Sequence, residues 1–218
     1  MIWASMGLGA VCAILFVQLL LLFLNERCEL KLQIRHGIVC SKSVVVTELS
    51  TACVIALWMW NCWNSYELSA MILQMILLIG MAVLTVMDYK IQLIPNKFLL
   101  FMVGIWLVVI GGTALVQPSI AMTLILQGIL GAAVGAVIFG VCYMLSRKQL
   151  GAGDVKLAIV MGLYMNPSCS VYSYLIGTVL CCVVSLGLII AKKIGWKDSI
   201  PMVPFLTVGT WIALFLVK

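Results

Sequence analysis

The sequence predicts an all-α protein, a polytopic bundle of about eight membrane-spanning helices. Two observations carry this prediction. The 218 residues are 65% hydrophobic and only 9% charged, with a mean hydropathy of +1.24, whereas soluble domains usually carry about 25% charged residues. The apolar residues also occur in long runs, and a helix needs roughly 20 of them to cross a bilayer. A transmembrane β-barrel would instead show short segments of alternating polarity.

The apolar runs divide the chain into eight expected spans within one membrane domain, residues 1–218. The first is expected to be a retained span rather than a signal peptide, because no positive residue precedes it. The sixth is short and follows a glycine-rich loop. Pro201 and Pro204 predict an irregular start for the eighth. The expected spans are residues 2–24, 44–62, 69–87, 98–116, 120–145, 154–166, 171–191 and 199–217.

Basic residues separate the loops into two classes. The loops 25–43, 88–97, 146–153 and 191–198 hold 12 of the 13 Lys and Arg residues, if Lys156 is counted with the third loop. All four fall on one side of an eight-span bundle, so the positive-inside rule places them in the cytoplasm. Both termini are then expected outside, in a plasma or inner membrane. This topology accounts for the net charge of +6, and no nucleic-acid partner is expected.

Two acidic residues lie at the ends of expected spans. Asp88 ends an apolar run, and Asp154 opens the sixth span within Gly151-Ala152-Gly153-Asp154. In the expected topology both carboxylates lie at the cytoplasmic boundary of the membrane. Ionisable groups there are functional candidates by default.

The five other acids have ordinary explanations. Glu26, Glu29 and Asp198 lie in basic loops and balance charge, and Glu67 lies in a short outer loop. Glu48 lies near the start of the second span, where an acid complements the positive end of a helix.

Two carboxylates can hydrolyse a peptide bond without a metal or cofactor. Close together, they share one proton because like charges repel. The ionised group takes a proton from water, and the neutral group donates one to the carbonyl oxygen. Gly151 and Gly153 would let a substrate backbone approach Asp154 closely. Asp154 as the N-cap of a helix after a tight turn, and Asp88 as an interfacial anchor beside Lys90, remain open alternatives.

No metal or other cofactor is expected. The polar loop 25–43 offers Cys28, His36 and Cys40, which is one ligand short of a structural zinc site. The chain also lacks a Gly-x-Ser-x-Gly motif, and His36, its single histidine, lies in a polar loop. Serine or cysteine nucleophile schemes are therefore disfavoured.

At this point the residues resemble the type IV prepilin peptidase family. The segment GAGDVKL at 151–157 is similar to the family's GxGD motif with its usual lysine and leucine. Asp88 followed by Pro95 and Asn96 resembles the segment of the first catalytic aspartate. The segment IPMVPF at 200–205 resembles the start of the family's last span, and VTELSTA at 46–52 more loosely resembles the second.

The resemblance implies an intramembrane aspartic-type endopeptidase active at the cytoplasmic face. It would cut the basic leader from type IV pilin-like precursors, so precursors and membrane lipid are the implied partners. Its catalytic segments would be 88–96 and 151–156, with Asp88 and Asp154 as the catalytic pair. The residues that shape the site would be Gly151, Gly153, Lys156, Pro95 and Asn96.

The first cytoplasmic loop departs from the family pattern. Many members carry two CxxC pairs there and also N-methylate the new N-terminus, whereas this shorter loop has only Cys28 and Cys40. The difference argues against a zinc-bearing subdomain and an accompanying N-methyltransferase activity. Compact members that serve Flp-type pili, competence pseudopili or archaeal preflagellins are more similar. The precursor and the oligomeric state stay open.

Two other functions fit boundary aspartates. A transporter or ion carrier could use them to bind protons or cations, but such proteins often show inverted repeats and midplane sites, and neither is evident here. An aspartyl protease of the presenilin and signal-peptide-peptidase type would share GxGD. Its first aspartate usually follows a tyrosine, whereas Met87 precedes Asp88 and Tyr89 follows it.

Overall fold

The computed structural model describes residues 34–35, 38–39, 42–62, 67–92, 94–145, 150–192 and 200–217. Two compact units divide the chain, Met1–Leu93 with Lys218 and Ile94–Val217, here called the first and second units. The expected span 2–24 lies outside the described residues. So do Cys28, His36 and Cys40 and the basic segments 146–149 and 193–199. The assignment of one domain stays a prediction.

The described chain is helical, which confirms the predicted class. The exception is one small antiparallel pair of two-residue strands, β1 (Ile34–Arg35) and β2 (Ile38–Val39). Four helices are long and apolar enough to cross a membrane: α3 (Leu68–Ile91), α4 (Asn96–Val116), α5 (Pro118–Leu145) and α7 (Pro167–Ile190). The chain is therefore a membrane protein, while the number of crossings and the sides of the termini stay predictions.

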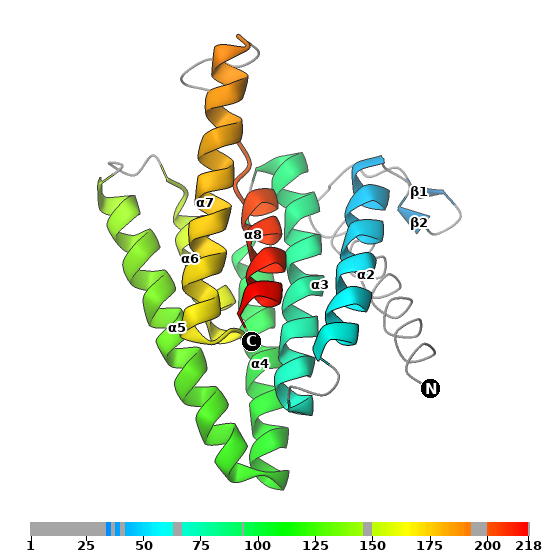
Figure 1. Ribbon diagram of the computed structural model, residues 1–218, viewed down its shortest axis with the longest axis vertical. Coiled ribbons are helices and arrows are strands. Elements are labelled where there is room, and N and C mark those ends of the chain that lie inside the picture. Colours follow the sequence, from blue (N-terminus) through cyan, green and yellow to red (C-terminus); the bar gives the residue numbers. More distant parts are fainter. Residues whose placement is uncertain are drawn as a thin grey trace. The chain divides into compact units, whose positions relative to one another are not determined.

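In the first unit, α2 (Lys42–Cys62) packs against α3 (Figure 1). The helix α3 continues one turn past its expected end at residue 87, so Asp88 lies inside its last turn. It ends where Gln92 adopts the left-handed conformation (φ 49°) and donates its N–H to the carbonyl of Asp88 at 2.9 Å. A residue in this conformation lets its N–H bond to one of the last free carbonyls of the helix, and it is usually glycine.

The second unit begins with the antiparallel pair α4 and α5, separated by Gln117 (Figure 1). Pro95 caps the start of α4, and its carbonyl accepts hydrogen bonds from the N–H groups of Phe98 and Leu99. Pro118 is the first residue of α5, where the missing N–H of proline costs no hydrogen bond. Both prolines therefore mark helix starts.

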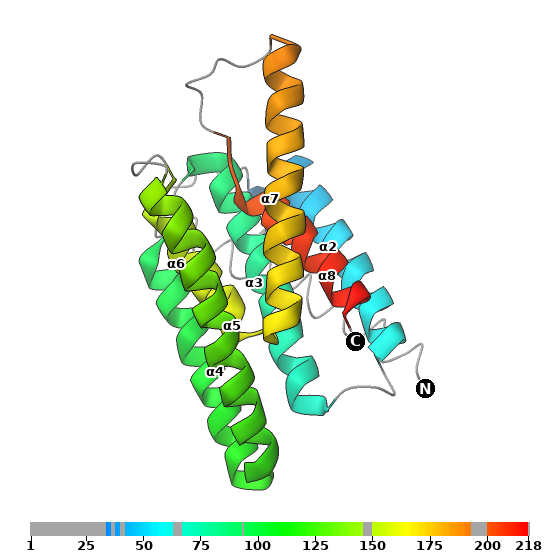
Figure 2. The same ribbon diagram turned by 60° about the vertical axis from the view of Figure 1, so that its left-hand side comes forward.

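The helix α6 (Ala152–Leu163) lies directly against α5, and the views in Figures 1 and 2 agree on this. The backbones touch through glycines. A Cβ atom added to Gly131 would collide with the carbonyl oxygen of Gly162, and one added to Gly135 would lie 2.7 Å from that of Ala158. In a membrane, where lipid competes for apolar surface, small residues of this kind let helices pack by direct backbone approach.

The helix α6 is too short to cross a bilayer alone. Its 12 residues extend about 18 Å, against a hydrocarbon core of about 30 Å. The turn into α7 lies beside Gly131, the 14th of the 28 residues of α5, where an added Cβ would be 2.8 Å from the carbonyl oxygen of Met165. The expected sixth span, 154–166, thus ends early, and the chain turns near the middle of α5.

The turn satisfies its own polar groups. The Asn166 side chain accepts a hydrogen bond from the N–H of Cys169 at 2.7 Å and so caps α7. The Ser170 hydroxyl donates to the Asn166 carbonyl at 3.0 Å. Irregular backbone at membrane depth is tolerated where protein buries it, and here Met165, Cys169 and Ser170 are buried.

Two buried tyrosines tie α6 to its neighbours. The Tyr164 hydroxyl donates to the Met102 carbonyl of α4, and the Tyr174 hydroxyl of α7 donates to the Ala158 carbonyl of α6, each at 2.6 Å. The Tyr174 ring also meets Phe139 of α5 edge-on, with centroids 5.3 Å apart. A net hydrogen bond contributes about 1 kcal/mol, so these contacts fix the position of α6 rather than dominate stability.

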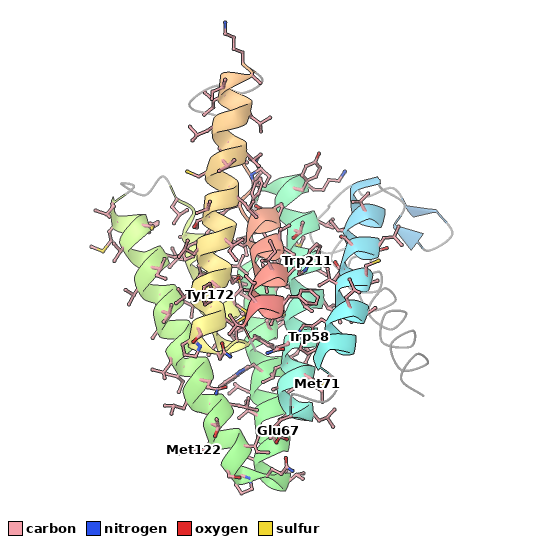
Figure 3. The ribbon with its side chains drawn as sticks, in the orientation of Figure 1. Trp58, Glu67, Met71, Met122, Tyr172 and Trp211 are labelled. Carbon is pink, nitrogen blue, oxygen red and sulfur yellow. The ribbon has the colours of Figure 1, made fainter. Side chains whose placement is uncertain are left out.

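The last helix, α8 (Val203–Leu216), packs on α7 (Figure 2). The Ser173 and Thr210 hydroxyls are 2.8 Å apart, and a Cβ added to Gly209 would lie 2.5 Å from the Ser173 carbonyl oxygen. Pro201 precedes the helix and Pro204 lies in its first turn, which explains its late start. Outward faces are apolar: Met122 of α5 and Tyr172 of α7, both labelled in Figure 3, are exposed large hydrophobic residues.

The contact between α5 and α6 predicts a specific loss of stability. We expect Gly131→Ala to lower the free energy of unfolding by about 1–3 kcal/mol, since the added methyl has no room. The matched variant is Gly140→Ala on the same helix, where nothing lies within 4 Å of the added Cβ; it should be neutral or stabilising because alanine favours helices. Thermal unfolding in detergent measures both, and equal midpoints for the two variants would contradict the packing.

Candidate active site

The first turn of α6 carries Asp154. Gly151 is the N-cap, with extended backbone, and the N–H of Asp154 donates to the Gly151 carbonyl at 3.0 Å. Asp154 is therefore the third helical residue and not the N-cap, so the capping alternative is wrong. Its half-buried carboxylate lies in the first turn, where the positive end of the helix dipole favours a negative charge.

The first glycine of the motif leaves room for the carboxylate. A Cβ added to Gly151 would lie 2.9 Å from Oδ2 of Asp154. The Asp154 side chain thus folds back over the residue three positions earlier. Any larger residue at 151 would push the carboxylate away, which gives the predicted site-shaping role of Gly151 a physical reason.

The second glycine faces a residue that the sequence interpretation missed. A Cβ added to Gly153 would lie 3.3 Å from Cβ and 3.5 Å from Cδ1 of Ile94. Ile94 is buried, with 9% exposure, and directly precedes Pro95. Its only signal in the sequence is that it is one of three aliphatic residues, with Ile91 and Leu93, in the predicted loop 88–97.

A hydrogen bond joins the same two segments. Nζ of Lys156 donates to Oδ1 of Asn96 at 3.0 Å, although 60 positions separate the two exposed residues. The structure therefore brings together the Pro95-Asn96 segment and the glycine-rich turn, which were predicted separately. All five residues predicted to shape the site lie in these two segments.

Asp88 lies in the last turn of α3 and is buried, with 6% exposure. Its neighbours Tyr89 and Lys90 are exposed, and such residues anchor helices at membrane interfaces. The anchoring interpretation therefore fits Tyr89 and Lys90 better than Asp88. Asp88 belongs to the first unit and Asp154 to the second, so their pairing stays a prediction.

Glu48 is a buried acid whose position corrects the sequence interpretation. It is the seventh residue of α2, no acid lies in the first turn of that helix, and its exposure is 6%. It therefore does not complement the helix start. Burying an acid in an apolar helix is costly, so such residues are functional candidates. Glu48 is therefore a second buried acid of the first unit besides Asp88, and Thr51 is buried one turn after it.

Comparison with protein families bears directly on these residues. The model of the type IV leader peptidase family matches residues 75–186, just over half of the 218 residues. The chain belongs to the type IV leader peptidase family. The matched stretch contains Asp88, Asp154 and both segments described above, and the family resemblance inferred from the motifs is confirmed.

A curated relative of this chain comes from Bacillus subtilis (strain 168) and is named prepilin leader peptidase/N-methyltransferase. The two are 25% identical over 166 residues, which cover 76% of this chain and 63% of the relative. The chain thus spans less than two thirds of that protein's length. No solved structure matches the chain.

Metal-ligating residues do not cluster in the described part of the chain. Among residues 42–62, 67–92, 94–145, 150–192 and 200–217, no three His, Cys, Asp or Glu side chains are grouped to hold an ion. The cysteines and histidine of the loop 25–43 lie outside these ranges.

The contact between Gly151 and Asp154 predicts the effect of a single methyl group. If Asp154 is catalytic as predicted, we expect Gly151→Ala to lower peptidase activity at least about 10-fold, because the added methyl displaces its carboxylate and small misplacements of a reacting group are costly. The matched variant Gly104→Ala adds a methyl where nothing lies within 4 Å and should leave activity unchanged. Cleavage of a leader-bearing precursor at equal membrane levels measures both; full activity of Gly151→Ala would show that the carboxylate does not need this space.

Proposed function

We propose that this protein is a prepilin leader peptidase of the aspartic type. It cuts the basic leader from type IV pilin-like precursors at the cytoplasmic face of the cell membrane. Membership of the type IV leader peptidase family carries the proposal. The relative named prepilin leader peptidase/N-methyltransferase supports the substrate class, and the apolar helices support a membrane location.

Asp88 and Asp154 are the proposed catalytic pair. In aspartyl chemistry one carboxyl group is ionised and the other carries the shared proton. The ionised group takes a proton from water as the water oxygen attacks the scissile carbonyl carbon, and the neutral group donates its proton to the carbonyl oxygen. Collapse of the tetrahedral intermediate breaks the C–N bond, and the leaving amine receives a proton from the carboxyl group that took one from water.

The helix ends suggest which aspartate plays which part. Asp154 lies in the first turn of α6, where the helix dipole favours a negative charge, and Asp88 lies in the last turn of α3, where the dipole disfavours one. Each effect amounts to about 0.3–1 kcal/mol. Together they favour the state in which Asp154 is ionised and Asp88 is protonated. Asp154 is accordingly the base that activates water, and Asp88 is the acid.

Chain connectivity supports the pairing. Six residues lead from Asp88 to Ile94, and Ile94 contacts Gly153 beside Asp154. A chain of six residues spans at most about 22 Å when fully extended. Asp88 is therefore tethered by a short connection to the turn that carries Asp154.

The proposal does not extend to N-methylation. The relative's name includes that activity, but the alignment covers 63% of the relative. The loop 25–43 has two cysteines rather than two CxxC pairs. We therefore propose cleavage alone.

Co-expression with a tagged prepilin-like precursor tests the function. We expect Asp88→Asn and Asp154→Asn each to lower cleavage by about 10²–10⁴-fold, the usual contribution of an acid or base, at unchanged membrane levels. Immunoblotting separates precursor from the shorter product.

The matched control for both variants is Glu67→Gln. Glu67 is exposed and lies at the end of α3 opposite to Asp88 (Figure 3), so its loss should leave cleavage intact. Cleavage that persists in both aspartate variants would reject the aspartyl mechanism.

A further inference from the structure

We infer that Lys156, Asn96 and Ile94 form a latch that positions Asp154. The latch has two contacts, the hydrogen bond from Lys156 to Asn96 at 3.0 Å and the packing of Ile94 on Gly153. The inference rests on the proposed function of Asp154. Lys156, Asn96 and Ile94 are positioning residues, since they act through the turn that holds the carboxylate.

The two contacts lie on either side of Asp154 in the sequence. Gly153 precedes it by one residue and Lys156 follows it by two. Residues three apart share one face of a helix, so Gly153 and Lys156 present the same face to the start of α4. Asp154 is rotated about 100° from Gly153 and about 160° from Lys156, and so lies away from that face. The latch therefore fixes the rotation of the first turn, and with it the direction of the carboxylate, without covering it.

The first turn of α6 needs such support. Helix starts leave four N–H groups without intrahelical partners, and glycine inside a helix costs up to about 1 kcal/mol. Here Gly153 is the second helical residue, and Gly151 and Ala152 are exposed. The opposite end of α6 is held by the contact of Gly162 with Gly131 and by the Tyr164 hydrogen bond. The latch is the corresponding restraint at the start.

The chemistry of the hydrogen bond favours positioning over proton transfer. Lys156 donates to a neutral amide oxygen, and that bond directs its ammonium group toward α4. Asn96 and Ile94 also follow Asp88 by eight and six residues. The latch thus joins the connection that leaves one proposed catalytic residue to the turn that carries the other.

A double-mutant cycle tests the latch. The variants are Lys156→Met, Asn96→Ala, the pair combined, and the exchange Lys156→Asn with Asn96→Lys. We expect each single variant to lower kcat about 10-fold with KM unchanged, because misplacing a reacting group costs rate rather than binding. The combined variant should be no worse than either single one, and the exchange should restore most of the rate.

Lys97→Met is the matched control. It removes the same charge from the exposed residue next to Asn96 and leaves the hydrogen bond intact, so kcat should stay within about twofold of the wild type. Multiplying effects in the combined variant, or a loss by Lys97→Met equal to that of Lys156→Met, would overturn the latch. So would a change confined to KM.

Hydrogen exchange separates failure of the latch from failure of the proposed function. We expect Lys156→Met, Asn96→Ala and Ile94→Ala each to speed exchange at the amides of 154–157, which follow the two unbonded amides at the start of α6 and report on opening of its first turn, while Lys97→Met leaves it unchanged. If the wild type cuts no precursor, the proposed function is rejected, and the hydrogen-exchange rates then test the latch independently of activity. Unchanged exchange in all three variants would overturn the latch even in a protein that cleaves.

Discussion

The direct contact of the α5 and α6 backbones is the constraint on which the second unit depends. Gly131 and Gly162 leave no space for a side chain between the two helices. Because α6 is pressed against α5 at this depth, the turn after it must lie near the middle of the bundle, and α7 must start there. The packing of α8 on α7 follows, with Gly177 and Gly209 repeating the same device. Small residues, rather than large apolar ones, set the architecture.

The glycine motif is explained by packing at both of its ends. Gly151 gives space to the carboxylate that the motif carries, and Gly153 gives space to Ile94 from a distant segment. One glycine thus acts within its own turn, and the other acts between parts of the chain. The two aspartates also differ in helix environment, since Asp154 lies in the first turn of α6 and Asp88 lies in the last turn of α3. In the proposed mechanism, this difference in helix environment assigns the two carboxylates different roles.

Hydropathy predicted the described helices within a few residues, because burial in lipid needs long apolar runs. It missed what backbone geometry decides. The extra turn of α3 depends on Gln92 in a conformation that usually needs glycine, and α6 ends early because Asn166 caps the next helix. The five proposed site-shaping residues came from the family resemblance. Ile94 was missed because it is one of three aliphatic residues in the connection 88–97 and has no pattern that sets it apart from Ile91 and Leu93. Glu48 was placed near a helix start, whereas the first turn of α2 begins earlier, at Lys42, and the burial of Glu48 depends on packing that the sequence does not show. The pairing of Asp88 with Asp154 depends on the placement of two units, which no local pattern encodes.

The turn between α6 and α7 has a consequence for biogenesis. Peptide groups outside helices cannot enter the hydrocarbon layer unless protein shields them, and the turn at Tyr164–Asn166 lies beside the midpoint of α5. The shield is supplied by α4 and α5, which are synthesised first. The hairpin of α4 and α5 is therefore synthesised before the turn between α6 and α7 that it shields. A chain with the same helices in the reverse order would have to hold that turn in the insertion channel until its neighbours arrived.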